Sequence, residues 1–594
     1  AVHGAISRAK NELFTPQSFR PQTYWQEIAG RVYGLYQELL TTNNALDFDD
    51  LLMNTVYLFR EHPEVLDKYH RQYLYILVDE WQDTNTAQYE LMRLLAGERR
   101  NVFVVGDEDQ SIYGWRGADF RNVMRFRQDF PSARTIFLEQ NYRSTQTILD
   151  VANAVIAPNV HRTPKRLHTD KGKGTSIVIH EAYNEVEEGQ YVIETISRLA
   201  AQREARPGDC AVMYRTNAQS RALEDAFVWA GIPYKLVGAT RFYARAEIKD
   251  VLAYLRVIHN PADNVGLSRI LNVPRRGIGS RTQAGLESLA AQMRTSLYGA
   301  LQILKEESEK GAEGNLGAML TARMRKPLLK FAEQLDELIA VRDKVSVPEL
   351  LDRLLEATGY ESHVRDGTDE GEDRWNNVME LFTVAREYAA LAPEEALTLF
   401  LEEVALVSDV DNLDESADAP TLLTLHSAKG LEFPVVFIVG LEDGLLPHSR
   451  SFDDADQMEE ERRLCYVGIT RAKERLYLVR AFRRTLYGFS DVSLPSRFLD
   501  DIPDHLVAGR VTEQTQSKRG AHRVRRQTEW ATPTAPRPVA RFRTGERVRH
   551  GAFGEGVVIE SRVRDDDEEV TVAFEGKGVK RLLASFAKLE KLEE

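Results

Sequence analysis

The sequence has 594 residues and a net charge of −14, with 43% hydrophobic and 28% charged residues, a composition typical of a soluble globular protein of about three to five domains. The acidic balance argues against non-specific nucleic-acid binding through the whole surface, so a nucleic-acid site would have to be a local groove. Two distant cysteines, Cys210 and Cys465, exclude a disulfide framework and a zinc cluster, and no apolar run approaches the roughly 18 residues of a membrane span. We therefore expect a cytoplasmic protein without membrane partners.

The predicted elements begin with helices joined by polar loops over residues 1–70. Seven short apolar runs follow, and their nearly continuous Val, Ile, Leu, Phe and Tyr content is typical of strands covered on both faces. The runs are Tyr73–Val78, Val102–Val105, Ile177–Ile179, Ala211–Tyr214, Leu422–Leu425, Val435–Val439 and Leu476–Val479. Helical patterns separate them, so we predict an α/β fold with parallel sheets, in which ligands bind at the carboxyl ends of strands.

Three later segments have a different character. Residues 245–405 lack such runs and show helical periodicity, which predicts a helical domain inserted between two parts of one α/β domain. Residues 504–542 are rich in Arg, Thr, Pro and Gln, which is typical of a flexible linker. The basic stretch 517–526 within it is either solvated or a contact for nucleic acid or an acidic partner. Glycine-punctuated alternation over 543–591 predicts a small β-barrel.

Two adjacent carboxylates, Asp79 and Glu80, follow the first apolar run, with Gln82 and Asp83 close behind. At the end of a buried strand such a pair suits a nucleoside-triphosphate site, where one acid holds Mg²⁺ and the next polarises the attacking water. A solvated acidic turn is the alternative interpretation, because Asp-Glu after a strand is not specific by itself.

The second apolar run leads into GDEDQSIYGWRGA, residues 106–118. Gln110 can sense a terminal phosphate, and Tyr113 and Trp115 beside Arg116 suit stacking on unpaired bases, worth roughly 1–3 kcal/mol for each base. Partly buried core aromatics are the alternative interpretation. The surrounding Gly, Ser, Asp and Arg residues favour a loop.

A third block, FLEQNYRST, spans residues 137–145. Tyr142 can cover a flat base and Arg143 can reach a phosphate, although a lone arginine is usually a surface cation.

The block PRRGIG, residues 274–279, resembles a glycine-type helix–turn–helix loop. Its backbone N–H groups at Gly277 and Gly279, with Arg275 and Arg276, would hold duplex phosphates. An ordinary helix-connecting turn is the alternative.

The order and spacing of VDEWQDTN, GDEDQSIYGWRGA and LEQNYRST resemble motifs II, III and IV of superfamily 1 DNA helicases of the UvrD/PcrA/Rep type. Further matching blocks are AVMYRTNAQSRALEDAF (211–227), EIKDVLAYLR (247–256), TLHSAKGLEFPVVFIVGLEDGLLPH (424–448) and EEERRLCYVGITRAKERLYL (459–478). The tail GERVRHGAFGEGVV resembles the Tudor-like end of UvrD and PcrA proteins. Trp81 stands where Phe or Tyr is more usual, which is a conservative aromatic change.

The resemblance assigns roles to matching positions, with ATP and Mg²⁺ as cofactors. Catalysis would depend on Glu80 as general base, Gln110 at the γ-phosphate, and Arg143 and Arg471 as arginine fingers. Nucleotide binding would add Asp79 for Mg²⁺, Tyr142 stacked on adenine and Glu432 on the ribose. The DNA-binding residues would be Tyr113, Trp115, Arg116, Arg215, Asn217, His426, Tyr487, Arg276, Gly277 and Gly279.

The resemblance also implies a domain order with two RecA-like motor domains, the first incomplete. The expected parts are the rest of a helical insert (1–64), the end of the first motor domain (65–138), the second motor domain (139–243 and 406–503), a helical inserted domain (244–405), a linker (504–542) and a Tudor-like barrel (543–594).

A phosphate-cradling loop of the form GxxxxGK[ST] does not occur in the sequence, since Gly172-Lys173 and Gly576-Lys577 are each followed by glycine. In the family this loop lies near the N-terminus, so we expect a truncated chain with little ATPase alone. One hypothesis is that it is part of an ATP-dependent 3′–5′ DNA helicase, acting in DNA repair on single strands and single/double-strand junctions. The other is a catalytically silent DNA-binding and partner-docking fragment, with RNA polymerase or repair proteins bound through the barrel.

Overall fold

The computed structural model describes residues 2–114, 117–238, 240–309, 320–409, 418–486, 489–508, 546–550, 554–564, 567–574, 578–583 and 590–591. Its contacts divide the chain into two compact units, Ala1–Thr512 and Glu513–Glu594. Among the helices of these ranges, none is both long and apolar enough to cross a membrane.

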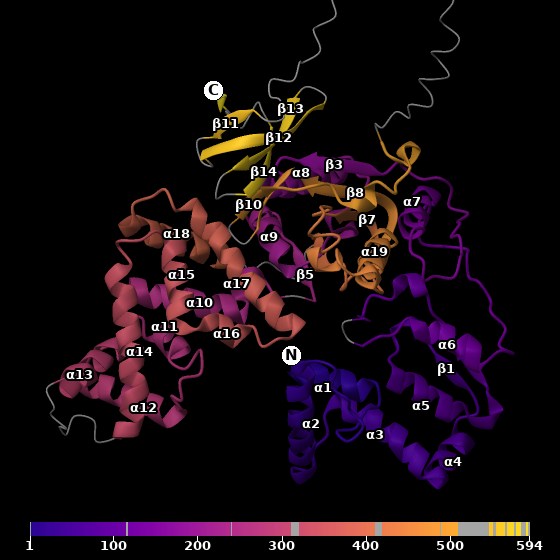
Figure 1. The fold of residues 1–594 in the computed structure, drawn as a ribbon, viewed down its shortest axis with the longest axis horizontal. Helices are drawn as coiled ribbons and strands as arrows, with labels where there is room; N and C mark the ends of the chain where they lie inside the picture. The colour runs from indigo at the N-terminus through magenta and orange to yellow at the C-terminus, as the bar shows by residue number, and fades with distance from the viewer. Residues whose placement is uncertain are drawn as a thin grey trace, which may run out of the picture. The chain divides into compact units, whose positions relative to one another are not determined.

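The chain begins with four helices: α1 (Val2–Asn11), α2 (Tyr24–Thr42), α3 (Phe48–Glu61) and α4 (Pro63–Gln72). Asp47 and Asp50 form a capping box that satisfies the first N–H groups of α3. Lys10 of α1 is fully buried and forms ion pairs with Asp47 and Asp50 at 2.6 and 2.8 Å. These ion pairs join α1 to the start of α3, and α1 also packs against α2. Figure 1 shows the three helices near the N-terminus.

A two-stranded parallel sheet follows, made of β1 (Ile76–Val78) and β2 (Val102–Val104), with α5 (Thr86–Ala96) and α6 (Arg121–Asp129) beside it. One sheet face packs on a core around Trp81. The other face is open, because Leu77 and Phe103 are 72% and 59% exposed. The prediction that both faces of the strands are covered is therefore wrong for this sheet, since α5 and α6 pack on one side only. The first strand also begins at Ile76, three residues later than predicted. We call residues 2–130 the first lobe.

The second sheet has six parallel strands in the order β3-β8-β7-β4-β6-β5. The strands are β3 (Val178–Ala182), β4 (Cys210–Tyr214), β5 (Lys235–Val237), β6 (Thr421–Thr424), β7 (Phe433–Ile438) and β8 (Ala472–Ala481). Along β4, Ala211 and Met213 enter one core, whereas Val212 and Tyr214 enter the core on the opposite face. Cover on both faces is thus confirmed for this sheet.

Four helices supply that cover. α7 (Gln146–Ile156) and α19 (Ala455–Ile469) pack on one face, and α8 (Glu185–Ala201) and α9 (Ser220–Trp229) pack on the other. We call this sheet with its four helices the second lobe. The two cysteines lie buried and free within it.

The segment between β5 and β6 is helical, as predicted, and has its own core. Its helices are α10 (Ala246–His259), α11 (Asn264–Ile270), α12 (Ser280–Met293), α13 (Leu297–Glu309), α14 (Ala322–Val341), α15 (Val347–Thr358), α16 (Tyr360–Val364), α17 (Asp369–Glu387) and α18 (Pro393–Asp409). Arg221 of α9 donates to Glu380 of α17 at 2.9 Å, and both side chains are buried. This pair joins the insert to the second lobe.

A hairpin of β9 (Arg483–Leu486) and β10 (Phe489–Val492) follows β8. The predicted linker begins too early, because Leu506 and Val507 pack into the core of the second lobe and the Leu506 carbonyl accepts from the Ile177 N–H. Most of that linker lies outside the described residues. The second unit is an antiparallel sheet of β11 (Arg547–His550), β12 (Gly554–Arg564), β13 (Asp567–Phe574), β14 (Gly578–Leu583) and β15 (Glu590–Lys591), as the alternation predicted.

Candidate functional site

The acidic turn after β1 is exposed and sharply bent. Glu80 has φ 50° and ψ 42°, a left-handed conformation that few non-glycine residues adopt and that is often found at functional sites. The Glu80 N–H donates to Asp79 Oδ1 at 2.8 Å, and Gln82 Nε2 donates to Glu80 Oε2 at 2.6 Å. Trp81 and Gln82 are buried behind them. The turn thus directs both carboxylates away from the core.

The turn after β2 lies beside the first one. Gln82 Oε1 accepts from the Asp107 N–H at 2.9 Å, which joins the carboxyl ends of the two strands. The chain then forms a short 3-10 helix, Glu108–Gln110, and Gln110 Nε2 donates to Asp107 Oδ2 at 2.7 Å. The residues that follow the two strands therefore lie together at one edge of the sheet.

Lys429 of the second lobe reaches this edge. Its Nζ contacts Asp83, lies 3.4 Å from Glu80 Oε2 and donates to the Gln110 carbonyl at 2.9 Å. The side chain is only 8% exposed. Burial raises the pKa of Asp83, and Lys429 opposes this rise. Sequence reasoning missed Lys429, although it lies inside the block TLHSAKGLEF that had been singled out.

Arg471, at the start of β8, also faces the first lobe. Its Nη2 is 3.5 Å from Gln110 Oε1, its Nε donates to the Val467 carbonyl, and the residue is 3% exposed. Burial lowers the pKa of Arg471 to about 10, and the nearby Arg143 guanidinium lowers it as well, whereas the Glu80 carboxylate opposes this. A guanidinium from one lobe and acids from the other thus share one site.

Arg143 is placed by the turn that precedes α7. The Asn141 side chain accepts from the Arg143 and Ser144 N–H groups at 2.8 Å, and Ser144 Oγ donates to the Ala472 carbonyl at 2.6 Å. These bonds fix the turn against the start of β8, next to Arg471.

A cavity of about 460 Å³ lies beside this turn, lined by Gln140, Asn141, Tyr142, Arg143, Lys171, Glu432 and Lys473. Arg143 Nε and Lys473 Nζ each lie 2.6 Å from the Glu432 carboxylate. These two cations, Lys473 first, lower the pKa of Glu432 to about 2. The Tyr142 ring is 76% exposed and available for stacking. Three residues predicted to bind nucleotide thus line one cavity with two further lysines.

The stretch of the second lobe between α7 and β3 makes another connection to the first lobe. Arg162 donates to both Asp109 oxygens at 3.0 and 2.8 Å, and Lys165 Nζ lies 2.9 Å from the same carboxylate. Burial alone would raise the pKa of Asp109, but the two cations lower it on balance.

The residues predicted to contact single-stranded DNA fall into three groups. Tyr113 OH lies 3.4 Å from the His426 carbonyl, and Tyr113 packs partly against the core of the second lobe. Arg215 forms a forked ion pair with Glu461 at 2.6–3.0 Å, while Asn217 begins a short 3-10 helix beside it. The predicted residues Trp115, Arg116 and Tyr487 lie outside the described residues.

The PRRGIG turn uses Arg276 internally. Its guanidinium donates to the Ile270 and Pro274 carbonyls at 3.0 and 3.1 Å and lies 4.7 Å from the Phe331 ring centroid. This inward position disagrees with the predicted phosphate contact by the Arg276 side chain. Gly277 has φ +78° and Gly279 precedes α12, so both belong to the turn itself.

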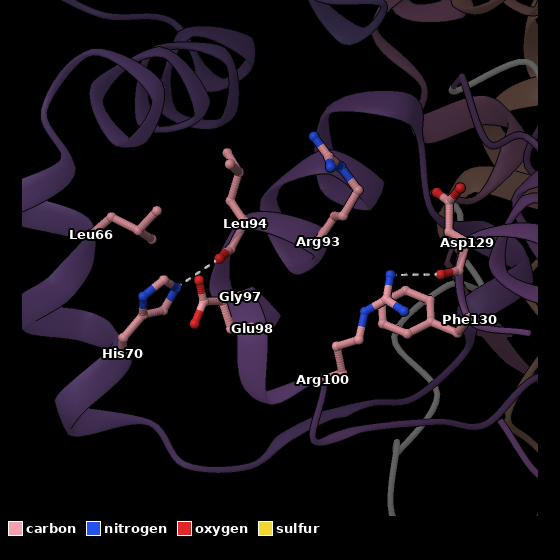
Figure 2. A pocket seen from close by; sticks show the side chains of 9 residues that line it. All are labelled: Leu66, His70, Arg93, Leu94, Gly97, Glu98, Arg100, Asp129 and Phe130. Atoms are coloured by element: carbon pink, nitrogen blue, oxygen red, sulfur yellow. Dashed lines mark hydrogen bonds between the residues drawn. The ribbon is translucent and has the colours of Figure 1, made fainter. Parts of the chain in front are cut away.

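Figure 2 shows another cavity, of about 360 Å³, on the first lobe. The His70 ring points toward the Leu94 carbonyl at 2.8 Å, and the Arg100 guanidinium lies over the Phe130 ring and donates to the Asp129 carbonyl at 3.0 Å. These polar groups are bonded within the lobe, and none of the predicted site residues lines this cavity.

Known proteins resemble this chain along its length. A model of the UvrD/REP helicase N-terminal domain matches residues 1–131, the UvrD-like helicase C-terminal domain matches 136–482, and the PcrA/UvrD tudor domain matches 544–591. The ATP-dependent DNA helicase PcrA of Staphylococcus epidermidis is 42% identical over 601 residues, which cover 100% of this chain and 80% of the relative. PcrA of Staphylococcus aureus is 42% identical over 603 residues, covering 100% and 81%.

Proposed function

Because this chain belongs to the family of PcrA/UvrD-type ATP-dependent DNA helicases, we propose that it moves 3′–5′ along single-stranded DNA and unwinds duplex at junctions. One observation supports a motor above the others: Lys429 and Arg471 of the second lobe reach Asp83 and Gln110 of the first. A triphosphate bound there would join the lobes, and its hydrolysis would release them.

The nucleotide is proposed to lie between the acidic turn and the cavity beside Arg143. Tyr142 stacks on adenine and the ionised Glu432 accepts from the ribose, supported by their shared cavity. Arg143 and Arg471 neutralise charge that develops on the phosphates during transfer. Both guanidinium groups come from the second lobe, so the site is complete only when the lobes are closed.

Glu80 is proposed as the general base, with Gln110 orienting the attacking water. The exposed Glu80 carboxylate lies near Lys429, and the Gln110 side-chain amide lies near Arg471. Asp79 would hold Mg²⁺, which supplies charge neutralisation on the phosphates when bound. In the described part of the chain no cluster of three or more His, Cys, Asp or Glu side chains could cage a metal. Mg²⁺ is usually held by one or two carboxylates, phosphate oxygens and water, so the single Asp79 carboxylate suits it.

Single-stranded DNA is proposed to pass along Tyr113, Arg215, Asn217 and His426, with Trp115, Arg116 and Tyr487 as further stacking or backbone contacts. Tyr113 and His426 approach each other from different lobes, which supports a path across both. Stacking tolerates any base, so such a motor need not read sequence. For the duplex, the N–H groups of Gly277 and Gly279 and the exposed Arg275 remain the proposed contacts of the PRRGIG turn.

The 594 residues alone are proposed to hydrolyse ATP weakly, because they contain no GxxxxGK[ST] loop. The alternative function, a DNA-binding and partner-docking fragment without catalysis, is favoured by the same observation. Docking of RNA polymerase or repair proteins would use the tudor-like unit, in a cytoplasmic DNA-repair role.

An ATPase assay with and without single-stranded DNA tests these proposals. We expect little turnover from the chain alone; appreciable DNA-stimulated turnover that Glu80→Gln abolishes would overturn this. Fusing a helicase segment that carries GxxxxGK[ST] ahead of the chain should produce turnover that is lost in Glu80→Gln and Arg471→Ala. Glu98→Gln, an exposed acid elsewhere on the first lobe, is the matched control and should keep it. A fused chain that binds single-stranded DNA without any turnover would favour the silent fragment.

A further inference from the structure

Residues 110–114 of the first lobe contact the second lobe along their whole length. The Gln110 carbonyl accepts from Lys429, and Tyr113 OH lies 3.4 Å from the His426 carbonyl. The Gly114 N–H donates to Glu460 Oε1 at 3.0 Å, and Glu460 belongs to α19. Glu460 is not among the residues proposed above to contact nucleotide or DNA.

Glycine at position 114 is explained by Glu460. A Cβ at this position would come within 2.5 Å of Glu460 Oε2, so any other residue would displace the carboxylate. The Gly114 carbonyl also accepts from the Gly117 N–H at 2.9 Å, and the Tyr113 carbonyl accepts from the Ala118 N–H at 3.2 Å. The Glu460 contact with Gly114 therefore also fixes Tyr113 on one side of the turn and Gly117 on the other.

Glu460 stands between two acids that bind other segments. Glu459 accepts from the Val160 N–H at 2.8 Å, and Glu461 accepts from the His448 N–H at 3.0 Å. The side chains of consecutive helix residues point about 100° apart around the helix axis, so three neighbouring residues of α19 can each bind a different segment of the chain. Burial raises the pKa of Glu460, and the Gly114 N–H opposes this rise.

The other end of α19 leads to the nucleotide side. Arg471 follows the helix by two residues and approaches Gln110 at 3.5 Å. Nine helical steps from Glu460 to Ile469 span roughly 14 Å. Glu460 in the first half of α19 contacts Gly114, and Arg471 just beyond its C-terminal end approaches Gln110, so a movement of this helix would be felt at Gln110 and Gly114 together.

On the basis of the proposed function, we propose that Glu460 is a positioning residue that holds Tyr113 and its turn for single-stranded DNA. Through this bond α19 transmits the nucleotide-dependent position of the second lobe to the strand. Glu460 itself touches neither nucleotide nor DNA.

The test compares Glu460→Gln with Glu460→Ala in the full chain, by fluorescence anisotropy of a labelled oligothymidylate. Both variants remove the same charge, but only glutamine keeps an oxygen that can accept from Gly114. We expect the alanine variant to bind about three- to tenfold more weakly than the glutamine variant, the effect of one lost hydrogen bond. The slope of log Kd against log salt should be equal in both, because no phosphate contact changes.

Two controls separate positioning from damage to the fold. Glu459→Gln and Glu459→Ala, which alter a neighbouring acid that binds Val160 instead, should not differ from each other in DNA affinity. Gly114→Ala should weaken binding as Glu460→Ala does, and combining the two should cost little more than either alone.

Equal affinities of Glu460→Gln and Glu460→Ala would overturn the inference, as would full additivity of Gly114→Ala with Glu460→Ala. A difference in salt slope between the Glu460 variants would also overturn it, because it would mean an electrostatic contact. If the wild-type chain fails to bind the oligonucleotide, the proposed function fails first, which makes the two failures distinguishable.

Discussion

Replacing Lys429 with methionine removes the ammonium that joins the lobes while keeping most of the side-chain volume. Lys429 and Asp83 are 8% and 18% exposed, so solvent screens their pairing less than that of a surface pair. Removing one partner leaves the other charge poorly solvated, which costs roughly 3–5 kcal/mol when burial is complete. Because Asp83 keeps some solvent contact, we expect the free energy of unfolding to fall by about 2 kcal/mol.

The loss of unfolding free energy in Lys429→Met should depend on pH in a defined direction. Burial raises the pKa of Asp83 in the folded chain, so the ionised Asp83 destabilises the fold at pH values above its unfolded pKa. This destabilisation becomes smaller as the pH falls and the carboxylate is protonated. Lys429 opposes that rise, so the pKa of Asp83 rises further in Lys429→Met. The difference in stability between wild type and variant should therefore be largest near neutral pH and shrink towards about pH 4.

Differential scanning calorimetry at several pH values measures this effect. For a cooperatively unfolding lobe of roughly 150–250 residues, a loss of about 2 kcal/mol lowers the unfolding midpoint by about 4–8 °C. Lys473→Met is the matched control, because Lys473 and Glu432 are 32% and 42% exposed and such pairs contribute about 0–1 kcal/mol. Adding Asp83→Asn to Lys429→Met should restore part of the loss. A shift no larger than that of Lys473→Met, or one that does not change with pH, would refute the reasoning.

Two further substitutions test the candidate nucleotide cavity and the core of the second lobe. Tyr142→Ala should weaken binding of a fluorescent ATP analogue on the order of tenfold through lost stacking, whereas Tyr142→Phe keeps affinity; equal affinities of the two would contradict adenine stacking. Arg484 pairs with Glu188 and Glu442 at 2.6 Å, all three being at most 5% exposed, so Arg484→Met should cost about 3–5 kcal/mol in thermal unfolding. The exposed neighbour Arg483 is its control, and an Arg483→Met midpoint as low as that of Arg484→Met would count against the buried network.

Local patterns in the sequence determined most of the secondary structure and the edge on which the acids lie. Apolar runs such as Val435–Val439 became strands covered on both faces, because a continuous apolar run suits only a strand that is buried on both sides. The turns after β1 and β2 lie at one edge because parallel strands end at the same edge, and Gln82 bridges Glu80 and the Asp107 N–H there. The same pattern was wrong for β1, where Leu77 remains exposed, because a run of apolar residues does not specify which helices cover it.

Only the tertiary structure decided which partner each charged side chain has. Arg215 and Arg276 were both candidate DNA contacts, yet Arg215 is paired with Glu461 and Arg276 donates to backbone carbonyls. Nothing in the local sequence around Lys429 indicates that its ammonium lies beside Glu80 and Asp83 of the other lobe. Helix and strand periodicities depend on neighbours within a few residues of each other, whereas an ion pair depends on two segments hundreds of residues apart meeting with correct geometry. That meeting is set by how the lobes pack, and no local pattern carries it.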